Sequence, residues 1–118
     1  MSVELNHTIV PASDPQVSAH FLADVLGLSV DPPLAHFTPV RLANQVTLDY
    51  DRAERFEPHH YAFMVIRDGG ITYYADPACR EPGRIYESKQ VPGRRGTYFR
   101  DPDGHLMEIL TPGGTEHR

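Results

Sequence analysis

The sequence predicts an α+β domain built from two related halves. A strand that contains a histidine occurs twice, once around His7 and again around His60. A helical pattern follows the first of these strands, and further β-rich segments follow in both halves. The 118 residues are enough for one domain with a buried core. We therefore expect a single domain over residues 1–118.

Composition restricts the partners of this domain. Sixteen acidic residues outweigh eleven Lys and Arg, and the formal net charge of −5 argues against nucleic acids and anionic membranes as partners. A single cysteine, Cys79, cannot form an internal disulfide, and no stretch is long and apolar enough for a membrane span or a signal peptide. We expect a reduced, cytoplasmic protein whose ligand is a small molecule, with no nucleic-acid partner and no membrane partner.

The first half is expected to run strand, helix, strand, strand. Ser13 or Asp14 can cap a helix whose first turn holds Pro15, and Gly27 supplies its end. Apolar residues recur at helical spacing between these caps: Val17, Phe21, Leu22, Val25 and Leu26. The strands of this half are predicted at residues 3–10, 37–42 and 46–50.

The second half follows a charged segment, residues 51–58, which is the natural joint of the chain. Its strands are predicted at residues 61–65, 71–74, 96–100 and 105–110. The last two form a hairpin around Asp101-Pro102-Asp103-Gly104, because Pro and Gly at these positions suit a type I turn closed by a left-handed glycine.

This hairpin places one acidic side chain among apolar neighbours. A three-residue loop at residues 102–104 sets Tyr98 opposite Glu108, with Leu106 and Leu110 on the same face of the sheet. An ionised carboxylate in such surroundings carries a high desolvation cost unless a cation compensates it. A divalent metal ion would do so, and an arginine is the alternative.

Two histidines complete a candidate metal site with Glu108. His7 lies on the first strand, although a histidine there is also compatible with a simple core role. His59 and His60 point to opposite faces of their strand, and the register favours His60. Two imidazoles and one carboxylate bind Fe(II), Mn(II) and similar ions and leave positions open for a chelating substrate.

Further candidates surround this site. The hairpin of the first half places Arg41 opposite Thr47 and sets Asp49 on the same face, although its turn lacks glycine. These three residues are predicted to contact the substrate. Tyr98 is predicted to donate a hydrogen bond or a proton to a substrate oxygen, with a purely structural role as the alternative.

Motifs spread over almost the whole chain resemble those of the vicinal oxygen chelate superfamily, which includes glyoxalases, bleomycin-resistance proteins, extradiol dioxygenases and fosfomycin-modifying thiol transferases. The matching segments occur in the expected order: Leu5-Asn6-His7, Leu26-Gly27-Leu28, His60-Tyr61-Ala62-Phe63, and Tyr98 to His105 followed by Glu108. The resemblance implies two βαβββ modules of the glyoxalase/dioxygenase type, residues 1–56 and 57–118, and metal ligands at His7, His60 and Glu108.

The sequence departs from this family's pattern at two places. Where four-ligand glyoxalases have a further carboxylate, the chain has Thr47, so that Asp49 would serve only after a shift of register. Residues 66–70 are too few for the helix that normally crosses the second sheet. We expect the second module to lack most of its helix, and a second copy to cover the exposed face in a homodimer.

The function predicted from these residues is that of a divalent-metal-dependent enzyme whose small substrate chelates the metal, with dioxygenase-like chemistry placed first. Fe or Mn is the expected metal, and Zn, Ni and Co accept the same ligands. One alternative is a metal-free drug-binding or metabolite-binding protein of the bleomycin-resistance type. A glyoxalase-like or fosfomycin thiol transferase-like activity is a further alternative.

Overall fold

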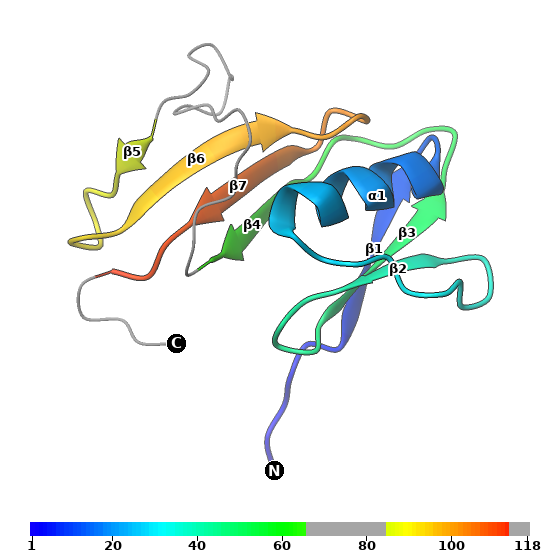
Figure 1. Cartoon of the computed structure of the whole chain (residues 1–118), viewed down its shortest axis with the longest axis horizontal. Helices are drawn as coiled ribbons and strands as arrows, with labels where there is room; N and C mark the ends of the chain where they lie inside the picture. The colour runs from blue at the N-terminus through cyan, green and yellow to red at the C-terminus, as the bar shows by residue number, and fades with distance from the viewer. Residues whose placement is uncertain (66–84, 114–118) are drawn as a thin grey trace. The chain divides into compact units, whose positions relative to one another are not determined.

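The computed structural model describes residues 1–65 and 85–113 of the chain. The chain divides into two compact units, of which the first spans Met1–Glu57 and the second begins at Pro58. Figure 1 shows a helix and strands in the first unit and strands in the second. The predicted α+β class is thereby confirmed. The described residues include no helix that is long and apolar enough to cross a membrane.

The first unit is a sheet with a helix on one face. Its elements are β1 (His7–Ala12), α1 (Pro15–Leu26), β2 (Thr38–Arg41) and β3 (Thr47–Arg52). The central strand β3 pairs in parallel with β1 and in antiparallel with β2. An antiparallel bridge between Val30 and Val40 adds one more extended segment beside β2. The connectivity is that of a βαβββ module.

The helix α1 begins and ends where its capping residues predict. The Asp14 side chain accepts hydrogen bonds from the backbone N–H groups of Gln16 and Val17, at 3.1 and 3.3 Å. Gly27 ends the helix in the left-handed conformation, with φ at 69°. Small and apolar residues form its buried side: Ser18, Ala19, Leu22, Ala23 and Val25. Val17, which the apolar spacing included, is 53% exposed. The side of the helix that is buried instead includes the small residues Ser18, Ala19 and Ala23.

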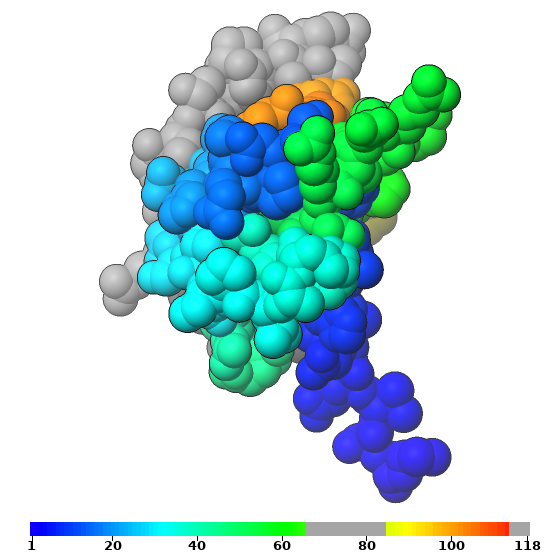
Figure 2. Space-filling view, turned by 90° about the vertical axis from the view of Figure 1, so that its right-hand side faces the viewer, coloured from blue at the N-terminus to red at the C-terminus, as the bar shows by residue number. Residues whose placement is uncertain are grey.

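The first strand starts at His7, later than the predicted residues 3–10. Val3 and Leu5 are exposed, and Figure 2 shows the first residues of the chain extending away from the rest of this unit. A strand needs an opposing backbone, and β3 begins only where Thr47 donates its N–H to the Asn6 carbonyl. Val3 and Leu5 precede this point, and they pair with no strand among the described residues of the first unit.

The residues of the first sheet alternate between two faces. On the face covered by α1 lie the buried side chains of Val10, Ala12, Val40, Leu48 and Tyr50. Gln16 of the helix hydrogen-bonds Thr38 on this same face, at 3.2 Å. His7 and Asp49 lie on the opposite face, since side chains alternate along each strand and paired residues share a face.

The β2–β3 hairpin has the predicted register although its turn lacks glycine. Arg41 lies opposite Thr47, as expected. The turn closes with the Gln45 N–H donating to the Leu42 carbonyl at 3.0 Å. Gln45 takes a left-handed conformation there, with φ at 71°, which glycine adopts at lower cost.

The second unit is a four-stranded sheet. Its strands are β4 (His60–Met64), β5 (Tyr86–Glu87), β6 (Arg95–Arg100) and β7 (Leu106–Leu110). The order is β4-β7-β6-β5, with β4 parallel to β7 and the other pairs antiparallel. The first strand of the unit thus pairs in parallel with its last, as in the first unit. The predicted strand at residues 71–74 and the predicted loss of the second helix lie outside the described residues.

Asp101 holds the turn of the β6–β7 hairpin. Its Oδ1 accepts hydrogen bonds from the backbone N–H groups of Asp103 and His105, both at 2.9 Å. The hairpin register is the predicted one, with Tyr98 opposite Glu108. The turn therefore fixes which side chain stands beside the acid.

One face of the second sheet is buried. It carries Phe63, Phe99, Met107 and Ile109, which are at most 8% exposed. We expected an apolar face of this sheet to be uncovered for want of a helix and to be covered by a second copy of the chain. The segment whose missing helix motivated this expectation falls outside the described residues, so the uncovered face and the homodimer both stay predictions.

Candidate metal centre

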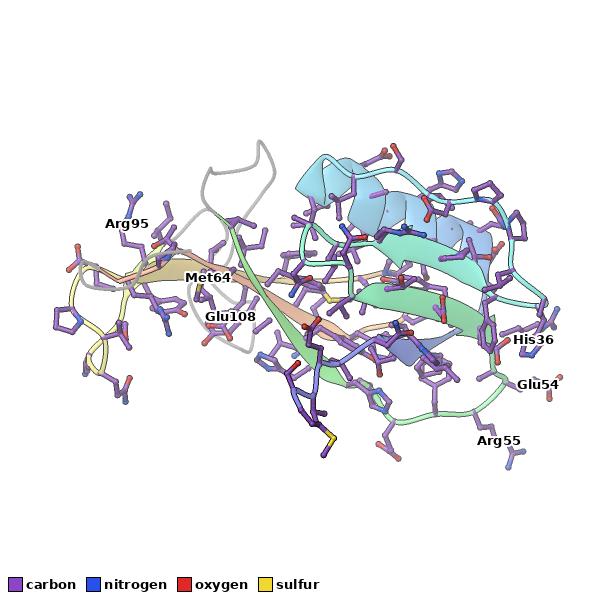
Figure 3. The ribbon with its side chains drawn as sticks, turned by 90° about the horizontal axis from the view of Figure 1, so that it is seen from below. His36, Glu54, Arg55, Met64, Arg95 and Glu108 are labelled. Atoms are coloured by element: carbon purple, nitrogen blue, oxygen red, sulfur yellow. The ribbon has the colours of Figure 1, made fainter. Side chains whose placement is uncertain are left out.

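His60 and Glu108 form a pair on the other face of the second sheet. His60 opens β4 and lies opposite Leu106, so Glu108, two residues further along the parallel strand β7, shares its face. The His60 Nε2 and the Glu108 Oε1 are 3.1 Å apart. The Glu108 side chain is 13% exposed and that of His60 46% exposed, so the imidazole is the accessible member of the pair. Figure 3 shows Glu108 on this sheet, near Met64 of the neighbouring strand.

Two tyrosines surround the Glu108 carboxylate. The Tyr86 hydroxyl donates a short hydrogen bond to Glu108 Oε2. Tyr98 stands opposite Glu108 in the register, and its ring stacks with that of Tyr86, with centroids 5.5 Å apart and planes inclined by 22°. The Tyr98 ring also meets the His60 imidazole edge to face, at 6.4 Å.

Both tyrosines are neutral hydrogen-bond donors. Burial raises the pKa of Tyr86, and its hydrogen bond to Glu108 raises it further. Burial likewise raises the pKa of Tyr98, and the negative charge of Glu108 adds to the shift. Each phenol therefore keeps its proton at neutral pH and can donate it in a hydrogen bond.

The predicted residues of the first unit share the face of its sheet that lies away from α1. His7 is exposed there, and its Nδ1 lies 2.8 Å from the Asn6 Oδ1. Asp49 is buried, at 7% exposure. Arg41 is more than half exposed and forms an ion pair with Asp31 at 3.3 Å, a partner that the sequence did not suggest.

The same register occurs in both units. Asp49 lies opposite Ile9, two residues after His7, and Glu108 lies opposite Ala62, two residues after His60. Asp49 is therefore the counterpart of Glu108 in the repeat. No shift of register is needed to give Asp49 this place, contrary to our expectation from the sequence.

The structure assembles the predicted site residues in two groups. His60, Glu108 and Tyr98 meet in the second unit, whereas the first unit presents the others on one face: His7, Arg41, Thr47 and Asp49. Among the described residues, no three or more His, Cys, Asp or Glu side chains already form a cluster that could hold an ion. The set of three ligands stays a prediction.

The geometry of the His60–Glu108 pair suits a metal ion. Two adjacent ligands that each lie about 2.1 Å from an octahedral ion stand about 3 Å apart. The 3.1 Å between Nε2 and Oε1 is a hydrogen-bond distance in the structure, and it also equals this spacing. An imidazole nitrogen and a carboxylate oxygen are also donor types that Fe(II), Mn(II) and Zn(II) accept.

Sequence reasoning missed Tyr86. It lies on a strand of two residues, too short to be found from an alternating pattern. The signal that would find it is Gly96, which lies opposite Tyr86 in the register. A Cβ at position 96 would lie 2.5 Å from the Tyr86 hydroxyl oxygen, so glycine there leaves room for the tyrosine ring.

The fold places the chain in a class of known proteins, those with the glyoxalase/dioxygenase fold. A lactoylglutathione lyase from Agrobacterium tumefaciens aligns over 94% of this chain and 95% of its own, with a TM-score of 0.64 and 17% identity. A glyoxalase/dioxygenase from Nostoc punctiforme aligns over 92% of this chain and 90% of its own, with a TM-score of 0.60 and 20% identity. These two likenesses establish the fold alone.

Two further structures are much more similar in sequence. Oxidase ChaP-H2 is 48% identical, with a TM-score of 0.83 over 97% of this chain and 98% of its own. Oxidase ChaP-H1 is 42% identical, with a TM-score of 0.83 over 98% of this chain and all of its own. The chain belongs to the vicinal oxygen chelate superfamily, within which it resembles the ChaP oxidases, and the predicted family is confirmed. No protein-family model and no curated protein sequence matches the chain.

Proposed function

We propose that this protein is a metal-dependent oxidase or oxygenase that acts on a small molecule bound to the metal through two adjacent oxygen atoms. The observation that carries the proposal is the His60–Glu108 pair, spaced for a metal ion, in a chain 48% identical to a protein named as an oxidase. Fe or Mn is the metal we propose, since both suit two imidazoles and a carboxylate.

His60 and Glu108 would hold the metal, and His7, of the same chain or of a second copy, is the third ligand expected from the sequence. The bound ion would supply Lewis acidity and a place where dioxygen and the organic substrate meet. Tyr98, a neutral phenol beside Glu108, would donate a hydrogen bond to a substrate oxygen. Thr47, Asp49 and Arg41 remain candidates for further substrate contacts.

The test is the metal content of the protein, purified anaerobically without a histidine tag. We expect close to one equivalent of Fe or Mn per chain by mass spectrometry. His60→Ala and Glu108→Gln should each remove the metal without unfolding the protein, as checked by circular dichroism. His59→Ala is the matched control, because His59 neighbours His60 in sequence but points to the other face of the strand.

Each outcome has a definite meaning. Metal that is lost in both site variants and kept in the His59 variant would support the enzyme, and oxygen uptake with catechols and other vicinal-oxygen compounds would then identify the reaction. Full metal content in both site variants would exclude His60 and Glu108 as ligands. A wild-type protein that binds no metal even after reconstitution would favour the metal-free binding protein of the bleomycin-resistance type.

A further inference from the structure

The two oxygens of Glu108 have different partners. Oε1 lies 3.1 Å from the His60 Nε2, whereas Oε2 accepts the hydrogen bond of the Tyr86 hydroxyl. A carboxylate can bind a cation through one oxygen or through both. Because the Tyr86 hydroxyl donates to Oε2, Oε1 is the Glu108 oxygen that faces His60 and is available to a cation.

We propose that Tyr86 is a positioning residue that keeps Glu108 a one-oxygen ligand and so preserves an open position on the metal for the substrate. The proposal rests on the proposed function, because it concerns the same site. A carboxylate that binds an ion through one oxygen leaves open a position that a carboxylate bound through both oxygens would close. Hydrogen-bonded partners of metal ligands commonly set ligand orientation in this way.

The packing around Tyr86 supports this role. Its ring lies over Gly96, where a Cβ would come within 2.6 Å of two ring carbons. Its other neighbour is the Tyr98 ring, stacked at 5.5 Å. A side chain held between a backbone surface and an aromatic ring loses little further freedom when it donates to Glu108, so the hydroxyl is already in place before a ligand arrives.

The test uses Mn(II) as the probe and Tyr86→Phe as the variant, which keeps the ring, the stacking and the fit over Gly96 but removes the hydroxyl. We expect Mn(II) to bind about 10-fold more weakly, measured by competition with a chelator. We also expect bound Mn(II) to relax water protons less, because a Glu108 that binds through both oxygens displaces one exchangeable water. The second measurement counts open positions, which a loss of stability alone would not change.

Tyr61→Phe is the matched control. It removes a phenol from the same sheet, but on the opposite face, where the Tyr61 hydroxyl lies 3.0 Å from the His59 Nδ1. Its Mn(II) affinity and water relaxation should equal those of the wild type. Gly96→Ala is a second variant, expected to displace the Tyr86 ring and to reproduce the effects of Tyr86→Phe.

The outcomes separate this inference from the proposed function. If the wild-type protein binds Mn(II) and Tyr86→Phe binds it with unchanged affinity and water relaxation, the role of Tyr86 is refuted while the metal site stands. If the wild-type protein binds neither Mn(II) nor Fe(II), both fail. A weaker affinity together with fewer open positions, seen in Tyr86→Phe and absent in Tyr61→Phe, would support the role of Tyr86.

Discussion

Replacing Asp101 by alanine should destabilise the fold by about 2 kcal/mol. Asp101 is 6% exposed, and its Oδ1 accepts the two backbone N–H bonds that close the β6–β7 turn. Each such bond to a charged acceptor contributes about 1.5 to 3 kcal/mol, so that the loss of both costs about 3 to 6 kcal/mol. The substitution also removes a buried oxygen, Oδ2, that no described residue hydrogen-bonds, which offsets about 1 to 3 kcal/mol. The midpoints of the two ranges leave a net loss of about 2 to 3 kcal/mol.

Asp101→Asn separates the hydrogen bonds from the charge. The amide oxygen can still accept both N–H bonds, so we expect a stability within about 1 kcal/mol of the wild type at neutral pH. Burial raises the pKa of Asp101 above its ordinary value of 3.8, although the hydrogen bond from the His105 backbone opposes the shift. The native state therefore binds the proton more tightly than the unfolded state. This contribution to stability is fully present below pH 3.8 and is lost as the pH rises through the higher native value.

Urea unfolding of the three proteins would measure these effects. The chain has no tryptophan and six tyrosines, so tyrosine fluorescence and circular dichroism are the suitable signals. Relative to the Asn variant, the wild type should gain stability as the pH falls from neutral into the acid range. An Ala variant within about 0.5 kcal/mol of the wild type would show that Asp101 does not hold the turn. If the stability of the wild type relative to the Asn variant instead rises with pH, burial does not dominate the pKa of Asp101.

Two further predictions concern the first turn and the assembly. Gln45→Gly should stabilise the fold by about 0.5 to 1 kcal/mol, because Gln45 has φ at 71°, and an unchanged or lower urea midpoint would contradict this reading of the turn. The sequence predicts a homodimer, and light scattering at micromolar concentration tests it directly, since a monomer mass would refute the prediction.

Local signals predicted much of this fold. Asp14 and Gly27 act on the backbone within a few residues, so the bounds of α1 follow from them. The β6–β7 turn likewise sets the register that brings Tyr98 opposite Glu108. The turn position also predicted the register of the β2–β3 hairpin. It did not predict that Gln45 takes the left-handed conformation that glycine usually adopts.

Features that depend on distant partners could not be predicted in this way. The start of β1 is set by where β3 begins, and the apolar Val3 and Leu5 carry no information about that. The contact of Tyr86 with Glu108 requires two strands and a glycine on a third segment to align. The counterpart of Glu108 in the first unit became evident only when the pairing of β1 with β3 was known.

That repeated pairing has a consequence for how the protein can change. The same strand pairing occurs in both units, so the side chains of one unit can change during evolution while those of the other unit are conserved. Such divergence is visible opposite the two acids, where Pro39 faces Asp49 and Tyr98 faces Glu108. Mutations, natural or designed, can therefore change the residues around Asp49 in the first unit and leave Glu108 and its tyrosines in the second unit unchanged.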